Sequence, residues 1–176
     1  MDVACAKFGY PLYKALRARY ADAATRVWRV SHFGGHVFAP TMMDMPTGRY
    51  WAYVDAKQAE QIAARTGEVA ALRGHYRGWA GAPYGFAQAA ECEVWQREGW
   101  AWFDVPKRCE VIAQEEAEDP SWAEVRLEFN DSEGRAGAYH ARVEVSHTVE
   151  TPPQSGSAET YGYPQYQVVS LTRSEA

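Results

Sequence analysis

The stretch PTGRYWAYVDAKQAEQIAARTG, residues 46–67, decides the fold class because it joins a strand pattern directly to a helix pattern. Residues 49–54 are rich in aromatic side chains, which favour β-strands, and the Pro-Thr-Gly before them is typical of a hairpin turn. Asp55 is the predicted N-cap of a helix that runs through Ala64 and ends near Gly67. Strands and helices therefore alternate within one unit, as in mixed α/β or α+β domains.

The rest of the sequence adds further elements to this unit. Helices are expected over residues 11–20 and 86–98, and strands over 26–31, 125–130, 139–149 and 165–172. We further expect extended chain over 37–45, a turn at 131–134, a short helix or solvated loop over the acidic residues 110–119, and a mobile loop within 151–164. Because the sequence has no internal repeat and no long linker, we predict a single domain over residues 1–176.

Composition excludes several classes of protein. Hydrophobic residues make up 47% and aromatic residues 14% of the 176 residues, which is enough for a sizeable core. A formal net charge of −5 argues against general nucleic-acid binding. The three cysteines are far apart, which excludes a disulfide scaffold and suits a reducing compartment. With neither a targeting segment nor an apolar run of about 20 residues, we expect a cytoplasmic protein that binds neither nucleic acid nor membrane.

Charge is unevenly distributed along the sequence. Residues 1–88 hold 11 Lys and Arg against 6 Asp and Glu, net +5, whereas residues 89–176 hold 7 against 17, net −10. One interpretation is that these charges lie on solvated faces of one domain. The other is that the basic half carries an anionic cofactor or meets an acidic partner.

The segment SHFGGH, residues 31–36, places His32 and His36 on either side of Gly34 and Gly35. Each glycine disfavours a helix by about 1 kcal/mol relative to alanine. The pair favours a tight loop with positive φ, in which backbone N–H groups can approach an anion or a sulfur atom. Two imidazoles that converge from such a loop form a candidate metal site, and the alternative is a purely structural loop.

The cysteines differ in their surroundings. Cys5 comes just before the first predicted helix, whose N-terminus favours a thiolate suited to metal binding or nucleophilic chemistry; the alternative is a small buried side chain. Cys92 has acidic neighbours that raise a thiol pKa, so we predict a structural role. Cys109 has basic neighbours but no partner by spacing. No Cys-x-x-Cys pair, nucleotide-binding glycine loop, Gly-x-Ser-x-Gly elbow or isolated carboxylate pair is present in the sequence.

Two segments resemble the sucrase/ferredoxin-like family, a family of thioredoxin-like [2Fe–2S] ferredoxins. They are CAKFGYPL at residues 5–12 and SHFGGHVFAP at residues 31–40. The segment 46–54 is similar to a further family motif, as is Arg-Gly at 77–78 followed by Gln-Ala-Ala-Glu at 88–91. The resemblance is strongest over residues 2–100.

The resemblance implies a thioredoxin-like mixed sheet flanked by helices, and an electron carrier rather than a catalyst. It also implies a [2Fe–2S] cluster held by two cysteines and two histidines. His32 and His36 match the histidine positions and Cys5 matches the second cysteine position, with Gly34 and Gly35 beside the cofactor. Neutral imidazole in place of thiolate makes such a cluster less negative and raises its reduction potential.

The family's first cysteine normally lies upstream, on an opening strand that this sequence is expected to lack. The sequence could start late, Cys92 or Cys109 could supply the ligand, or the cluster could be lost while the fold is kept. A missing strand would expose a sheet edge and allow a homodimer. Three functions therefore stay open: electron transfer with a redox partner protein, a cluster-free thioredoxin-like interaction module, and a zinc site formed by Cys5, His32, His36 and water.

Overall fold

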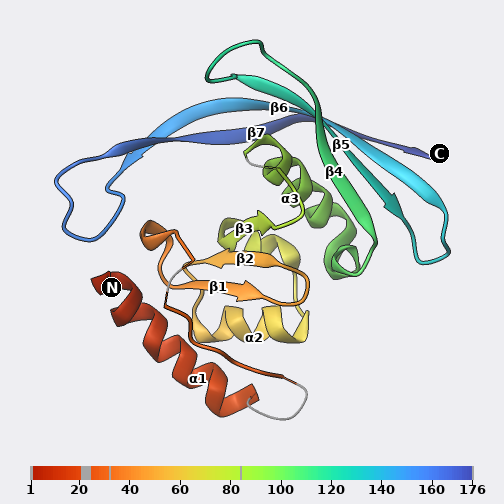
Figure 1. Ribbon diagram of the computed structural model, residues 1–176. Helices are drawn as coiled ribbons and strands as arrows, with labels where there is room; N and C mark the ends of the chain where they lie inside the picture. The colour runs from red at the N-terminus through yellow and green to blue at the C-terminus, as the bar shows by residue number, and fades with distance from the viewer. Residues whose placement is uncertain (1, 21–24, 32, 84, 176) are drawn as a thin grey trace.

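The computed structural model describes residues 2–20, 25–31, 33–83 and 85–175, and it combines helices with two antiparallel sheets (Figure 1). The first sheet has the order β1–β2–β3, formed by Thr41–Asp44, Arg49–Ala52 and Tyr76–Trp79. The second has the order β4–β5–β6–β7, formed by Lys107–Gln114, Trp122–Asn130, Ala136–Thr151 and Tyr161–Glu175. The predicted α+β class is confirmed.

The helices cover the first sheet and fill the space between the two sheets. They are the π-helical turn η1 (Cys5–Gly9), α1 (Tyr10–Tyr20), α2 (Ala56–Ala64), α3 (Phe86–Glu98) and the 3₁₀ turns η2 (His36–Phe38), η3 (Val69–His75) and η4 (Gly99–Phe103). Figure 1 shows α3 under the long, curved β6–β7 hairpin, while α1 and α2 lie at the far side of the first sheet. In the described part of the chain, no helix combines the length and apolar character that a membrane span requires.

Two helices agree with their predicted boundaries for identifiable reasons. At the start of α2, the backbone N–H of Gln58 donates to Asp55 Oδ1 and the backbone N–H of Asp55 donates to Gln58 Oε1, each at 2.8 Å. This reciprocal pair is a capping box, which satisfies two N–H groups at the helix start. The helix α3 runs from Phe86 to Glu98, as predicted.

Strand β5 shows how the second sheet buries one face. Ala123, Val125, Leu127 and Phe129 are buried, and they alternate with residues that point away from the core. This period of two places every second side chain on the same face of the strand. Because α3 contacts all four strands of this sheet, it covers that apolar face.

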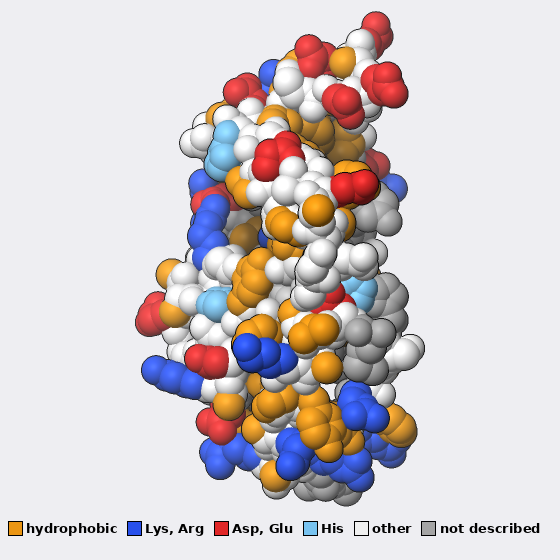
Figure 2. Space-filling view, turned by 90° about the vertical axis from the view of Figure 1, so that its left-hand side faces the viewer, with side chains coloured by type: hydrophobic (Ala, Val, Ile, Leu, Met, Phe, Trp, Pro, Cys, Tyr) orange, Lys and Arg blue, Asp and Glu red, His pale blue; other side chains and the backbone are white. Residues whose placement is uncertain are grey.

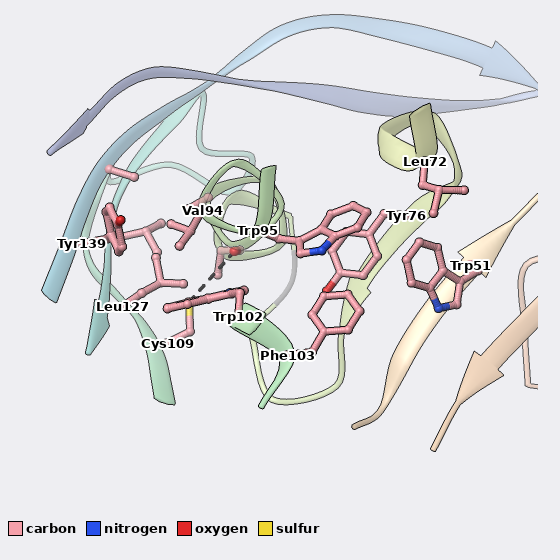
Figure 3. Close-up of a cluster of buried hydrophobic side chains, with 14 of the residues drawn as sticks. Trp51, Leu72, Tyr76, Val94, Trp95, Trp102, Phe103, Cys109, Leu127 and Tyr139 are labelled. Carbon is pink, nitrogen blue, oxygen red and sulfur yellow. Dashed lines mark hydrogen bonds between the residues drawn. The ribbon is translucent and has the colours of Figure 1, made fainter. Parts of the chain in front are cut away.

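An aromatic cluster packs α3 and η4 against the first sheet (Figure 3). Trp51 of β2, Tyr76 of β3 and Phe103 of η4 surround Trp95 of α3, at ring-centroid distances of 5.6, 4.8 and 5.4 Å. All four side chains are buried. Burial of this much apolar surface contributes roughly 25 cal/mol for each Å² removed from water, so this cluster is a main source of stability.

Three predictions need correction. The expected mixed sheet is not found, because every strand pair in the described residues is antiparallel; these pairings give the thioredoxin-like description no support. Residues 26–31, predicted as a strand, form none, and the strands that pair in the first sheet are β1 with β2 and β2 with β3. The acidic segment 110–119 was expected to be a short helix or a solvated loop, but residues 110–114 belong to β4, in which Cys109 is buried.

The loop between β6 and β7 spans residues 152–160, where a loop was predicted. The structure does not test its predicted mobility. Strands β1 and β3 form the edges of the first sheet, and β4 and β7 form the edges of the second. The predicted homodimer and the single-domain organisation stay predictions.

Candidate metal centre

The structure brings together two of the predicted ligands from separate motifs. Cys5 lies in η1, at the start of the N-terminal helix, and His36 begins η2. The Cys5 Sγ and His36 Nδ1 atoms are 3.2 Å apart, although 31 residues separate them in the sequence. Both residues are half-buried, so the pair is shielded without being sealed from solvent.

A third donor, which the sequence analysis missed, completes this group. A carboxylate oxygen of Asp2, Cys5 Sγ and a ring nitrogen of His36 all lie within 4.8 Å of one another. An oxygen, a sulfur and a nitrogen at such spacing form a ligand set typical of transition-metal sites. The spacing Asp-x-x-Cys was a usable signal, because residues i and i+3 share one face of a helical turn.

The local sequence explains how Asp2 and Cys5 converge. Asp2 Oδ1 accepts a hydrogen bond of 2.8 Å from the backbone N–H of Ala4, in the first turn of the N-terminal helix. A side chain that accepts from an N–H two residues later is the usual arrangement at a helix start. The helix therefore begins immediately after Asp2 and carries Cys5 in its first turns.

The glycine pair positions His36. Gly34 and Gly35 have φ values of 93° and 75°, so the predicted left-handed loop is confirmed. Gly35 is the N-cap of η2, and its carbonyl accepts from the backbone N–H of Phe38 at 2.9 Å. Whether the two glycines contact a cofactor stays a prediction.

Hydrogen bonds and a cation–π contact hold the turn η2 against residues of the first sheet and the residue that follows β2. The Tyr53 hydroxyl donates to the carbonyl of Val37 at 2.8 Å, and the Tyr53 backbone N–H donates to the carbonyl of Phe38 at 3.1 Å. The Arg77 guanidinium lies 3.9 Å from the centre of the Phe38 ring. The segment that follows His36 is therefore held by Tyr53, directly after β2, and by Arg77 of β3.

The loop between β6 and β7 also contacts this group. The backbone N–H of Ser155 donates to Asp2 Oδ2 at 2.7 Å, and the Ser155 hydroxyl donates to Asp2 Oδ1 at 2.9 Å. Hydrogen bonds of this kind orient a ligand and are often as important as the ligand itself. Ser155 was also missed by the sequence analysis, because 153 residues separate it from Asp2.

Electrostatics at the centre differ from the expectation for Cys5. The hydrogen bonds from Ser155 hold the pKa of Asp2 below its usual value. Burial, and next the nearby Asp2 charge, raise the pKa of the Cys5 thiol, which opposes the thiolate that this helix start was expected to favour. Metal ligation requires the thiolate, and therefore binding of a metal ion at Cys5 would release a proton.

The remaining candidate residues lie elsewhere or outside the description. His32 falls outside the described residues. Cys92 is a half-buried residue of α3, and burial raises the pKa of its thiol to about 12. Cys109 is buried under α3, where its Sγ faces the carbonyl of Ala87 at 4.0 Å and burial raises its pKa to about 12. Neither cysteine joins the Asp2–Cys5–His36 group.

A groove leads to the cysteine side of the centre. It has a volume of about 980 Å³ and runs between α1, the segments 25–31 and 33–34, β1 and α2. Cys5 and Gly34 line it beside the apolar side chains of Leu12, Met42 and Ile62. The centre therefore has both an apolar wall and a route to solvent.

The surface beside the centre is basic and aromatic. Figure 2 shows Lys and Arg side chains gathered with hydrophobic ones at the lower end of the molecule, level with α1 in Figure 1, and Asp and Glu side chains toward the upper end. The Arg29 guanidinium lies 5.4 Å from the ring centre of Tyr10, and the Lys14 ammonium lies 5.9 Å from it. The charge asymmetry of the sequence is thus also an asymmetry in space.

The fold and the site define an α+β protein with a Cys/His/Asp group capable of holding a metal ion. Residues 1–78 match the family described as sucrase/ferredoxin-like, which confirms the resemblance over that part of the chain. The matched region contains Asp2, Cys5 and His36 and ends within β3, before α3 and the second sheet. Searches of curated proteins and of solved structures found no match to the chain.

Proposed function

We propose that this protein is an electron-transfer protein whose N-terminal centre holds a [2Fe–2S] cluster through Cys5, His36 and His32. The observation that supports this most directly is the 3.2 Å contact between Cys5 Sγ and His36 Nδ1. It pairs the cysteine motif with the histidine motif inside the region that matches the sucrase/ferredoxin-like family.

The donor chemistry is compatible with such a cofactor. Thiolate and imidazole are the ligands of mixed Cys/His iron–sulfur centres, and a bound cluster would supply one-electron redox chemistry. Cys5 would bind as the thiolate, and His36 would bind as neutral imidazole after its contact with the Cys5 sulfur opens. The half-buried positions of both residues suit a carrier, because electrons must reach the centre from another molecule while bulk water is limited.

The chain's own residues would then set how the centre works. The hydrogen bonds of Tyr53 to η2 hold the histidine segment in place, which limits rearrangement of the ligand between redox states. The apolar side chains of the groove reduce solvent access on the cysteine side. We also propose a redox partner protein as the source or acceptor of the electron, with no catalytic step in this chain.

The test is anaerobic purification, or reconstitution of the purified chain with iron and sulfide. We expect a coloured protein with about two irons and two labile sulfides per chain that is reduced reversibly. Cys5→Ala and His36→Ala should lose the iron, whereas the matched controls Cys92→Ala and His140→Ala should keep it, because neither control residue belongs to the ligand group. A colourless chain that retains no iron under these conditions would contradict the proposal.

The alternatives give different results in the same experiment. A zinc site would give one zinc ion per chain without labile sulfide. A cluster-free interaction module would bind no metal, and His36→Ala would leave its folding and partner binding unchanged.

A further inference from the structure

Asp2 lies beside Cys5 and His36 in the metal-ligand group, and its role there follows from what the other cysteines do. The proposed cluster needs an anionic ligand besides Cys5. Cys92 and Cys109 lie on α3 and β4 and do not join the group. The acceptor that does join the group is the carboxylate of Asp2, three residues before Cys5.

We infer that Asp2 is a metal ligand of this centre and supplies the anionic donor that the resemblance assigns to the first cysteine. The cluster part of this inference rests on the proposed function. An ionised carboxylate carries the same charge as a thiolate, so a set of one carboxylate, one thiolate and imidazole preserves the charge that two cysteines would give. Carboxylate oxygen is an accepted ligand of zinc and of iron beside histidine.

The geometry favours a ligand role for Asp2 over a purely structural one. As a helix cap, Asp2 would need only its hydrogen bond from Ala4. Instead, both of its oxygens are also held by Ser155, at 2.7 and 2.9 Å, from a loop at the other end of the chain. The result is a carboxylate fixed beside Cys5 Sγ and His36, with its orientation set before any ion arrives.

This arrangement also gives the β6–β7 loop a role. Ser155 lies outside the region that matches the family, and yet it positions a residue inside that region. Ser155 is therefore a positioning residue: it contacts the ligand rather than the metal. Removing its hydroxyl leaves the backbone hydrogen bond to Asp2 Oδ2 in place, so its loss should weaken metal binding without abolishing it.

The first experiment uses Co²⁺ titrated into the metal-free protein, with binding followed by the thiolate-to-cobalt absorption band. The wild-type chain should bind one ion and show this band. Asp2→Asn should bind Co²⁺ more than a hundredfold more weakly, and Ser155→Ala about ten- to a hundredfold more weakly. The matched control Asp131→Asn, in the hairpin turn after β5, should bind like the wild type. Asp2→Cys should restore tight binding and strengthen the band, which a merely structural role for Asp2 would not produce.

The second experiment reconstitutes the same variants with iron and sulfide and measures iron content and reduction potential. Asp2→Asn should lose iron, and Asp2→Cys should retain it at a different potential. If Asp2→Asn binds Co²⁺ and the cluster as the wild type does, the inference is overturned while the proposed function stands. If the wild type takes up no cluster but its Co²⁺ binding depends on Asp2, the proposed function fails while the inference stands.

Discussion

The buried ion pair between Arg49 and Glu91 makes the strongest prediction about stability. Arg49 of β2 and Glu91 of α3 are 1% and 0% exposed, and Arg49 Nη1 lies 2.5 Å from Glu91 Oε1. The Tyr76 hydroxyl donates to Glu91 Oε2 at 2.7 Å, and Trp102 Nε1 donates to Glu91 Oε1 at 2.9 Å. The Glu91 carboxylate thus links the first sheet to α3, the helix that packs against the second sheet.

The perturbation is Glu91→Gln, which keeps the shape of the side chain and removes its charge. The Arg49 guanidinium would then be a buried charge without a counter-charge, and breaking a buried pair in this way costs about 3–5 kcal/mol. Arg49 also lies 4.3 Å from the centre of the Phe103 ring, and this cation–π contact offsets a part of that cost. Against a total stability of about 5–15 kcal/mol for a domain, the variant should be only marginally folded.

The assay is urea unfolding followed by tryptophan fluorescence, because Trp95 and Trp102 lie in the core that the pair supports. We expect Glu91→Gln to lower the free energy of unfolding by about 3 kcal/mol or more. The double variant Arg49→Met with Glu91→Gln removes both charges, so its loss should be smaller than the sum of the two single losses by about 0.5–3 kcal/mol. A loss below about 1 kcal/mol for Glu91→Gln, or strict additivity in the double variant, would refute this reasoning.

Three further predictions concern the centre, the half-buried Lys107 and the capped helix α2. Gly35→Ala and Gly134→Ala place alanine at nearly equal φ values of 75° and 77°, so each variant should lose about 1–2 kcal/mol of stability. Only Gly35→Ala should weaken Co²⁺ binding. Equal binding by the two variants would contradict the role of Gly35 in placing the histidine. Burial lowers the pKa of Lys107 from 10.5 to about 8, so the unfolded state binds more protons between these values. The free energy of unfolding of the wild type should therefore rise from pH 8 to 10.5 relative to that of Lys107→Met, and a flat difference would argue against the shift. Asp55→Ala removes the capping box and should lower the free energy of unfolding by about 0.5–2 kcal/mol in urea titrations, whereas an unchanged midpoint would show that the cap is dispensable.

Local signals in the sequence predicted those parts of the fold that neighbouring residues control. The capping residue Asp55, the helix over 86–98 and the alternating strand β5 are of this kind. The same local reasoning was wrong for residues 26–31, whose valine and tryptophan residues are typical of a strand but which form no strand in the structure. A strand exists only when another chain segment accepts its hydrogen bonds, and residue type alone does not decide that.

The residues of the metal centre likewise include some that the sequence identified and others that it did not. Cys5, His36 and the left-handed glycine loop were identified from the sequence, because short motifs carry ligand types and backbone requirements. The Asp-x-x-Cys spacing of Asp2 was a usable signal that was overlooked, whereas Ser155 could not be found because its contact with Asp2 joins segments 153 residues apart. The Arg49–Glu91 pair was missed for the same reason, as 42 residues separate its partners.

By itself, the sequence determined the α+β class, the family resemblance of its first part, and the two motifs that meet at the centre. These depend on periodicity, caps and residue chemistry, which act over a few residues. Only the tertiary structure decided that the sheets are antiparallel and separate, that a buried carboxylate of α3 pairs with Arg49 of the first sheet, and that Asp2 stands beside Cys5 and His36. Such contacts arise when distant segments bury surface together, and their partners are selected by packing rather than by spacing in the sequence.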